Sequence, residues 1–208
     1  TYFAALYTRY AFGDSAFRAE MAGIRQTVVR AAVVAERPVL DTAQTELMSL
    51  LTANSYQKGG FAPHMLRGEV GDSAFFRATR AYYTANQHKN ALTDDLRVAM
   101  EREAARDLTW FFDQWLTRPG FPELTLKWEH DRATASLAVV VTQSERFAPF
   151  RIPLRVEVVD ANGKLTQLVI DVPERRTARI AVPGRWVEPP FAVRPDPLVE
   201  MLGEFRTP

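Results

Sequence analysis

Residues 107–130 read DLTWFFDQWLTRPGFPELTLKWEH, and the pattern of apolar residues changes inside this stretch. From Asp107 onward the aromatic side chains have core-like helical spacing, and Arg118-Pro119-Gly120 ends the helix. After Pro122 apolar and polar residues alternate, as expected for a half-buried strand. The apolar positions are Leu124, Leu126 and Trp128. The stretch therefore predicts a change from helices to strands near residue 120.

The residues before this change have the pattern of consecutive helices. Gly13 is expected to end a first helix, and Asp14 to cap a second. The apolar face of the second helix carries Phe17, Met21, Ile24 and Val28. A loop from residue 36 leads to a helix that includes Leu47 and Leu50. Further helices are predicted from Asn54 to about Gly68, and after the capping residues Asp72, Thr93 and Asp107.

One short motif occurs twice, as FGDSAF at residues 12–17 and as VGDSAF at residues 70–75. Each copy contains the end of a helix, a glycine stop, an aspartate cap and a phenylalanine anchor. A solenoid needs at least three regular repeats. We therefore interpret the two copies as one short turn between helices, used twice.

The residues after Pro122 have the period and the turns of a β domain. Apolar positions alternate again in 137–141, 152–158, 168–172 and 178–182, which gives at least five strands with the first. Asn162-Gly163 is a two-residue hairpin signal. The predicted fold class is α+β, with a mostly helical part at residues 1–121 and a small antiparallel β-sandwich at residues 122–208.

Composition limits the classes of partner. The net charge of +1 gives no basic field for nucleic acid. No apolar run approaches 18 residues, so no membrane span is expected. The absence of cysteine excludes disulfides, thiolate metal sites and a cysteine nucleophile. Residue 1 is not methionine and already lies inside a helical pattern, so we expect a fragment of a longer protein.

Most catalytic patterns are missing from the sequence. The histidines His64, His88 and His130 have no metal-ligand spacing. There is no phosphate-binding glycine loop and no G-x-S-x-G elbow. Asp94 and Asp95 point in different directions on a helix, so we interpret them as first-turn carboxylates that complement the helix dipole. The arginines around two β turns are interpreted as solvated surface: Arg175, Arg176, Arg179 and Arg185.

The segment NSYQKGG at residues 54–60 is the exception, because two glycines occupy the first turns of its predicted helix. Each glycine costs roughly 0.5–1 kcal/mol relative to alanine in a helix. Asn54 and Ser55 are suitable N-cap residues. Tyr56 is open to two interpretations on these grounds, an ordinary aromatic at a helix start or a functional phenol.

Several segments resemble the gluzincin zinc aminopeptidases, the family of aminopeptidase N and leukotriene hydrolase. SYQKG resembles that family's Tyr-Glu-Lys-Gly element, and HMLRGEVGDSAFF resembles the helix and turn that follow it. LTDDL and DLTWFFDQWLTRPGFPEL resemble its late catalytic-domain signature. TYFAALY resembles the helix that follows the family's zinc-ligand glutamate. The resemblance covers about residues 1–130, and it implies the C-terminal part of a thermolysin-like catalytic domain followed by a β domain.

The resemblance also implies a role for Tyr56. In this family the tyrosine donates a hydrogen bond to the oxyanion that forms when zinc-bound water attacks a peptide carbonyl. Small glycines beside it would permit close approach of another backbone or of the substrate. Gln57 departs from the family pattern, which has glutamate there.

By the same resemblance the zinc ligands are expected upstream of Thr1, in an H-E-x-x-H helix and a distal glutamate. This chain itself is expected to hold no metal and no other cofactor, and to be inactive alone. The parent protein would use Zn²⁺ and an upstream general base to remove N-terminal residues from peptides.

Two alternatives remain open at this point. One is a non-catalytic relative that acts as a protein–protein interaction module, and the other is a structural β-sandwich adaptor with a helical cap. For the fragment interpretation, we expect an exposed apolar face that the missing N-terminal part of the same protein covers. The candidates for this face are Tyr2, Leu6 and Tyr10, together with the surface at Gly59-Gly60.

Overall fold

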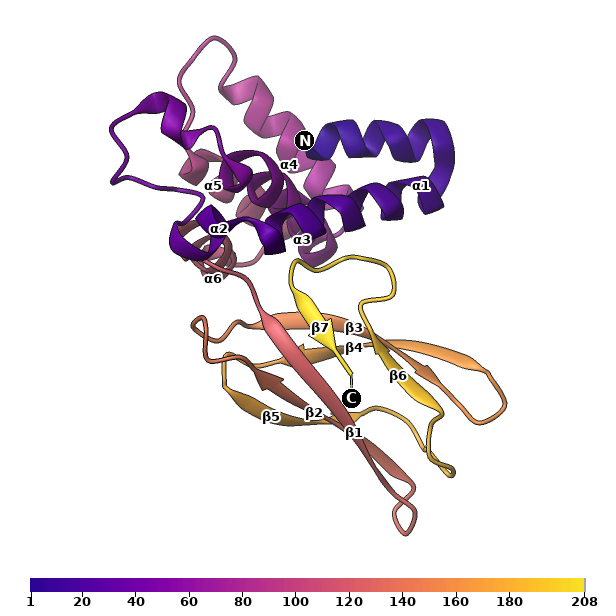
Figure 1. Cartoon of the computed structure of the whole chain (residues 1–208). Helices are drawn as coiled ribbons and strands as arrows, with labels where there is room; N and C mark the ends of the chain where they lie inside the picture. Colours follow the sequence, from indigo (N-terminus) through magenta and orange to yellow (C-terminus); the bar gives the residue numbers. More distant parts are fainter. Residues whose placement is uncertain (208) are drawn as a thin grey trace. The chain divides into compact units, whose positions relative to one another are not determined.

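The structure is a computed structural model that describes residues 1–207. The chain forms two compact units, which divide after Pro119. The first unit is helical and the second is built from strands (Figure 1). The predicted α+β class is confirmed, and the helices precede the strands along the chain.

The helical unit contains six α-helices, one 3₁₀ turn and two π turns. The α-helices are α1 Tyr2–Arg30, α2 Ala32–Glu36, α3 Gly59–Val70, α4 Asp72–Ala85, α5 Thr93–Ala104 and α6 Thr109–Phe112. The 3₁₀ turn is η1 Leu47–Leu50, and the π turns are η2 Asn54–Lys58 and η3 Asp113–Thr117.

Two of the predicted capping residues do not occupy the N-cap position. Leu108 is the N-cap of α6, and the Asp107 carboxylate, one residue earlier, accepts a hydrogen bond from the Thr109 N–H at 2.9 Å. Thr93 is not a cap, because Leu92 holds that position and the Asp95 carboxylate accepts from its backbone N–H at 2.7 Å. The carboxylate three residues into the helix takes over the capping that the threonine hydroxyl was expected to supply.

The repeated motif forms a corner between helices in both places. Gly13 has φ 87° inside α1, and Gly71 has φ 82° between α3 and α4. Figure 1 shows α1 turning back on itself at the first corner. The aspartates do not cap, since each bonds the arginine five residues before it, in the pairs Arg9–Asp14 and Arg67–Asp72. The anchors Phe17 and Phe75 are buried, so the interpretation of one turn used twice is confirmed.

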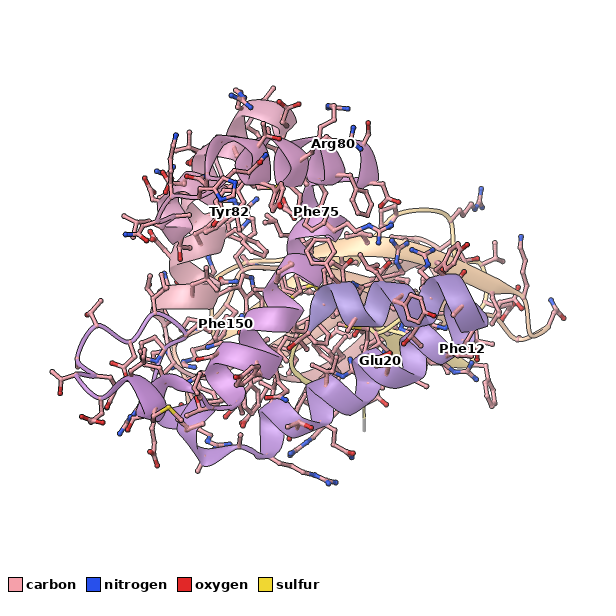
Figure 2. The ribbon with its side chains drawn as sticks, turned by 90° about the horizontal axis from the view of Figure 1, so that it is seen from above. Phe12, Glu20, Phe75, Arg80, Tyr82 and Phe150 are labelled. Carbon is pink, nitrogen blue, oxygen red and sulfur yellow. The ribbon has the colours of Figure 1, made fainter. Side chains whose placement is uncertain are left out.

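The exposed apolar face of α1 differs from the one predicted. Tyr2 is only 3% exposed and Leu6 is half-buried. The neighbouring helical face carries exposed aromatic rings at i, i+4 and i+7, which we call the aromatic stripe: Phe3, Tyr7 and Tyr10. Phe12 is also exposed, at the corner of α1 (Figure 2). The burial of Tyr2 follows from its packing against Phe75 of α4, a contact between distant parts of the sequence.

The second unit contains seven strands in two sheets. They are β1 Glu123–Asp131, β2 Ser136–Gln143, β3 Ile152–Val159, β4 Leu165–Val172, β5 Thr177–Val182, β6 Ala192–Pro195 and β7 Glu204–Arg206. The sheet orders are β5-β2-β1-β7 and β4-β3-β6. The five predicted strands are all present.

The β unit departs from the prediction in three details. The short strands β6 and β7 were not predicted, and β7 pairs parallel with β1, so the sandwich is not wholly antiparallel. The hairpin at Asn162-Gly163 is longer than two residues, because the Asp160 N–H donates to the Lys164 carbonyl around it. Trp128 is 40% exposed, although it continues the alternation of Leu124 and Leu126, which are buried.

Within residues 1–207, no helix has both the length and the apolar character that crossing a membrane requires.

Candidate functional site

Tyr56 lies in the π turn η2, which leads directly into α3. The turn is defined by a hydrogen bond from the Gly59 N–H to the Asn54 carbonyl, five residues earlier. Such turns insert one extra residue into a helix and occur frequently at functional sites. The predicted N-caps Asn54 and Ser55 are therefore inside the turn, and neither side chain caps the helix.

Asn54 fixes the first residue of this turn to α2. Its side chain is buried, and its Nδ2 donates to the carbonyls of Val33 at 3.2 Å and Arg37 at 2.9 Å. Val33 is the second residue of α2, and Arg37 is its C-cap. The Asn54 Oδ1 is buried and has no hydrogen-bond partner within residues 1–207. The amide thus ties η2 to another helix instead of serving as the predicted cap.

Lys58 fixes the last residue of the turn. Its side chain is 1% exposed, and its Nζ donates to the backbone carbonyl of Arg118 at 2.9 Å. Burial lowers the pKa of Lys58 to about 8, because the low-dielectric interior disfavours the charged ammonium. The sequence offered two signals for this residue: Lys58 is the lysine of the SYQKG element, and it is one of four lysines in a chain whose other basic residues are arginines.

The Tyr56 ring is 49% exposed between these two buried anchors. Its hydroxyl makes no hydrogen bond to any other described residue, so the phenol is available to donate to a ligand. The backbone beneath it is held by the Tyr56 N–H, which donates to the Thr52 carbonyl at 3.1 Å. The arrangement is an immobilised turn that presents an accessible phenol.

The two glycines after Lys58 lie at close contacts. A Cβ on Gly60 would be 2.6 Å from the Cβ of Thr1, the residue before α1. A Cβ on Gly59 would be 3.2 Å from the Asn54 carbonyl oxygen and 3.6 Å from Val39. Gly60 therefore permits α1 and α3 to approach each other, about one helical turn along α3 from Tyr56.

The three histidines have structural surroundings. His64 lies among the rings of Tyr2, Phe17 and Phe61, at centroid distances of 5.6, 5.4 and 5.4 Å. His88 is an exposed residue with φ 60°, and the His130 Nε2 lies 2.7 Å from the Trp186 carbonyl oxygen. Over residues 1–207, no group of three or more His, Cys, Asp or Glu side chains is arranged to hold a metal ion.

The paired aspartates and two of the four clustered arginines also have partners. Asp94 bonds Arg97 in the first turn of α5, as expected of first-turn carboxylates. Arg176 donates to the carbonyls of Ser144 and Phe147, and Arg179 pairs with Glu129 at 2.8 Å. These arginines fasten turns and strands within the β unit.

A second polar network links α1 to the corner at Gly71. The Arg67 guanidinium donates to both carboxylate oxygens of Asp72 and to the Tyr2 hydroxyl at 3.3 Å. The hydrogen bonds to Asp72 raise the pKa of Arg67, and the same bonds lower the pKa of Asp72. Burial raises the pKa of the Tyr2 phenol. We assign this network to packing, since the Tyr2 phenol is buried.

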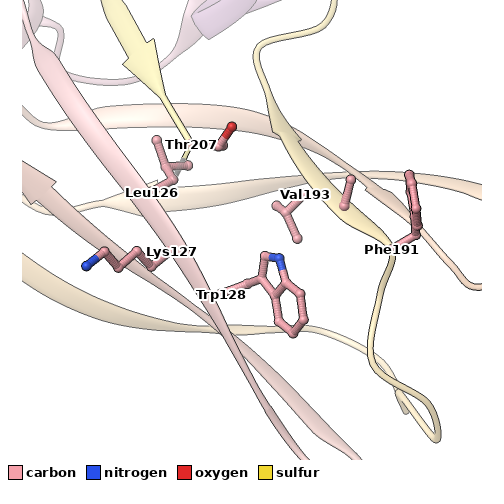
Figure 3. A pocket seen from close by; sticks show the side chains of 7 residues that line it. Leu126, Lys127, Trp128, Phe191, Val193 and Thr207 are labelled. Carbon is pink, nitrogen blue, oxygen red and sulfur yellow. The ribbon is translucent and has the colours of Figure 1, made fainter.

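The β unit carries a pocket of about 440 Å³ between β1 and β6. Figure 3 shows the indole of Trp128 reaching from β1 toward Val193 of β6. Lys127 is the one ionisable side chain in its lining, which also includes the exposed ring of Phe191. Thr207 supplies a hydroxyl to the same lining.

Comparison with known proteins gives consistent results. A family model described as the Peptidase family M1 domain matches residues 1–115. The chain is 39% identical over 67 residues to aminopeptidase N of Lactococcus lactis subsp. lactis. This match covers 32% of this chain and 8% of that protein. It is 25% identical over 138 residues to aminopeptidase N of Escherichia coli K12, covering 63% of this chain and 16% of that protein.

Among solved structures, the chain is similar to Legionella pneumophila aminopeptidase A in complex with aspartic acid. The TM-score is 0.77 at 18% identity, and the likeness covers 98% of this chain and 22% of that chain. At this identity the likeness concerns the fold. In each of these three comparisons, the chain spans less than a quarter of the relative's length.

Proposed function

The chain belongs to peptidase family M1, and on that premise we propose that its parent protein is a zinc-dependent aminopeptidase. The parent removes N-terminal residues from peptides, and this chain supplies one wall of the active site. Relatives named aminopeptidase match parts of this chain, which supports the reaction class.

The observation that carries the proposal is the presentation of Tyr56. Its ring is half exposed, its hydroxyl has no partner among the described residues, and its turn is anchored at Asn54 and Lys58. A phenol held this way can donate a hydrogen bond to a peptide carbonyl oxygen. The bond strengthens as that oxygen becomes the oxyanion of the tetrahedral intermediate, so it lowers the transition state more than the ground state.

The described residues of this chain do not form a zinc site. Zinc sites use three or four converging nitrogen, sulfur or oxygen ligands, and residues 1–207 offer no such group. We propose that the zinc ligands of the parent belong to polypeptide outside this chain, as the family resemblance implies. The contact of Thr1 with Gly60 brings the start of α1 to the helix that follows Tyr56. This contact supports zinc ligands that lie close to Tyr56. On its own, the chain is proposed to be inactive.

The partner proposed for the helical unit is the remaining part of the same protein. The aromatic stripe exposes three rings on one helical face, Phe3 at 57%, Tyr7 at 66% and Tyr10 at 88%. Exposed apolar patches usually mark surfaces that another polypeptide covers. The relatives are several times longer than this chain, which supports a covering segment from the same polypeptide.

Replacement of Tyr56 by phenylalanine in the parent protein tests the function. We expect kcat for an aminoacyl-amide substrate to fall about 10²–10³-fold, the usual cost of losing one oxyanion donor. KM, zinc content and melting temperature should change little, because the ring and its packing remain. Tyr10→Phe is the matched control, since Tyr10 is 88% exposed on α1, and it should retain full turnover. Near-normal turnover of Tyr56→Phe would refute the role of this phenol.

A second candidate function, a non-catalytic interaction module, is favoured by the apolar surface of the β unit. Trp128 and Phe191 are exposed beside the pocket between β1 and β6. A parent protein that binds peptides or proteins through this surface but hydrolyses no aminoacyl amide would support this candidate over the peptidase.

A further inference from the structure

We propose that Lys58 is a positioning residue for Tyr56: its buried ammonium, bonded to the Arg118 carbonyl, holds η2 in the conformation that presents the phenol. This inference rests on the proposed function. The proposed role of Lys58 is indirect, because its side chain is buried and acts through the conformation of η2.

The first argument is the geometry of the turn. Tyr56 and Lys58 belong to the same five-residue π turn, so the position of one backbone restricts the other. Lys58 is bonded 60 residues further along the chain, at the residue that ends the second π turn, η3. The segment at η3 is itself fixed, because the Leu40 N–H donates to the Leu116 carbonyl at 2.8 Å. The ammonium therefore joins η2 to a rigid part of the helical unit.

The second argument is energetic. An ammonium has three N–H donors, and among residues 1–207 this one has a single acceptor, the Arg118 carbonyl. Burying such a charge without full compensation is unfavourable, and an apolar side chain of similar length is often the more stable choice. The lowered pKa of Lys58 reflects this penalty. A buried lysine at this place is thus poorly explained by stability alone, whereas a directional bond that sets the turn explains it.

The third argument is the local backbone. A π turn has one more residue than an α-helical turn, and it can relax to regular α-helix by shifting its register. Such a shift would rotate Tyr56 about the helix axis. Asn54 restrains the first residue of η2, but Lys58 restrains the last, where the chain enters α3. Loss of the lysine bond leaves that end of the turn unrestrained.

A double-mutant cycle in the parent protein tests the inference, with Lys58→Met, Tyr56→Phe and the two combined. Methionine keeps the length of the side chain and removes its donor. We expect Lys58→Met to lower kcat about 10-fold to 100-fold, as expected for a displacement of about 1 Å. KM should stay within about threefold, as for loss of an interaction made in the transition state. In the Tyr56→Phe background the same change should have almost no effect, because the phenol it positions is already absent.

The controls separate positioning from general destabilisation. Met65→Ala truncates a buried side chain of α3, the helix that follows η2. This variant should lower the melting temperature while kcat is retained. Zinc content should be unchanged in every variant. If Lys58→Met does not fold, Lys58→Leu, which also lacks a donor and is smaller, takes its place in the cycle with the same expected coupling.

The outcomes are distinct. Unchanged kcat in Lys58→Met, or an equal loss in both backgrounds, would overturn the positioning role of Lys58 while Tyr56 keeps its own role. Full activity of Tyr56→Phe would overturn both this inference and the role of Tyr56 in the proposed function.

Discussion

Thr1 lies against Gly60 so closely that a Cβ on the glycine would be 2.6 Å from the Cβ of the threonine. Real Cβ atoms essentially never approach at this distance, so α1 and α3 meet here only because residue 60 has no side chain. The two glycines that weaken the helix on propensity grounds are therefore explained by close packing near Tyr56.

The contact predicts the effect of alanine at this position. Gly60→Ala gains helix propensity but must displace Thr1, so we expect a net loss of stability. Gly68→Ala on the same helix has open space around its Cβ, and it should stabilise by about 0.5–1 kcal/mol. Thermal unfolding of the two variants gives the comparison. Equal stabilisation by both alanines would show that the Thr1 contact yields without cost.

The buried lysine predicts a pH dependence. The pKa of Lys58 is about 8 in the folded chain and 10.5 when unperturbed, so between these values the unfolded chain holds a proton that the folded chain has released. The contribution of Lys58 to the free energy of unfolding should therefore rise with pH across this window, by on the order of 3 kcal/mol. Below pH 8 both states are protonated and the burial penalty is constant.

The measurement is a set of denaturant titrations of the native protein and Lys58→Met at several pH values. The difference between the two proteins cancels other titrating groups, such as Tyr2. A difference that stays flat from pH 8 to 10.5 would contradict the burial of a charged Lys58.

The two corners predict unequal effects from the same substitution. Asp72 accepts two hydrogen bonds from Arg67, whose side chain is only 12% exposed, whereas Asp14 accepts one from Arg9, which is 42% exposed. Asp72→Asn should cost roughly 0.5–1 kcal/mol of stability, and Asp14→Asn less than about 0.5 kcal/mol. Chemical denaturation at neutral pH measures both costs. An equal or larger cost for Asp14→Asn would show that exposure does not govern the strength of these pairs.

The lowered pKa of Asp72 gives this prediction a direction with pH. A carboxyl group with a depressed pKa in the folded state stabilises the protein at neutral pH, and this contribution is lost as acidification protonates it. The destabilisation by Asp72→Asn should accordingly disappear in acid.

The β unit should affect stability more than turnover. Glu157 is buried, and it accepts hydrogen bonds from Arg194 and Gln167, both at 3.2 Å. Glu157→Ala should lower the free energy of unfolding by about 1–3 kcal/mol. Arg179→Ala breaks an exposed pair and should cost less than about 0.5 kcal/mol.

The parent protein with either change, or with Asp171→Ala, should keep its turnover within a few-fold when folded. A hundredfold loss of kcat without unfolding would place the active site in the β unit instead.

Several errors of prediction have one physical origin. Tyr2 was expected on an exposed face, but Phe75 and Arg67, more than sixty residues away, bury it. Trp128 continues a strand alternation whose earlier members are buried, yet it lies beside a surface pocket. Local periodicity indicates which residues share a face, whereas burial depends on the elements that pack against that face.

The sequence by itself determined the order of helices and strands, the change near residue 120, the two glycine corners and the chemical identity of Tyr56. These features depend on apolar periodicity, turn residues and side-chain type, which act over a few neighbouring residues. Only the tertiary structure decided how Tyr56 is held. The bonds from Asn54 to the end of α2 and from Lys58 to Arg118 join residues 17 to 60 positions apart. Because a hydrogen bond across such a separation leaves no local pattern in the chain, Asn54 resembled a helix cap and the buried bond of Lys58 was not predicted.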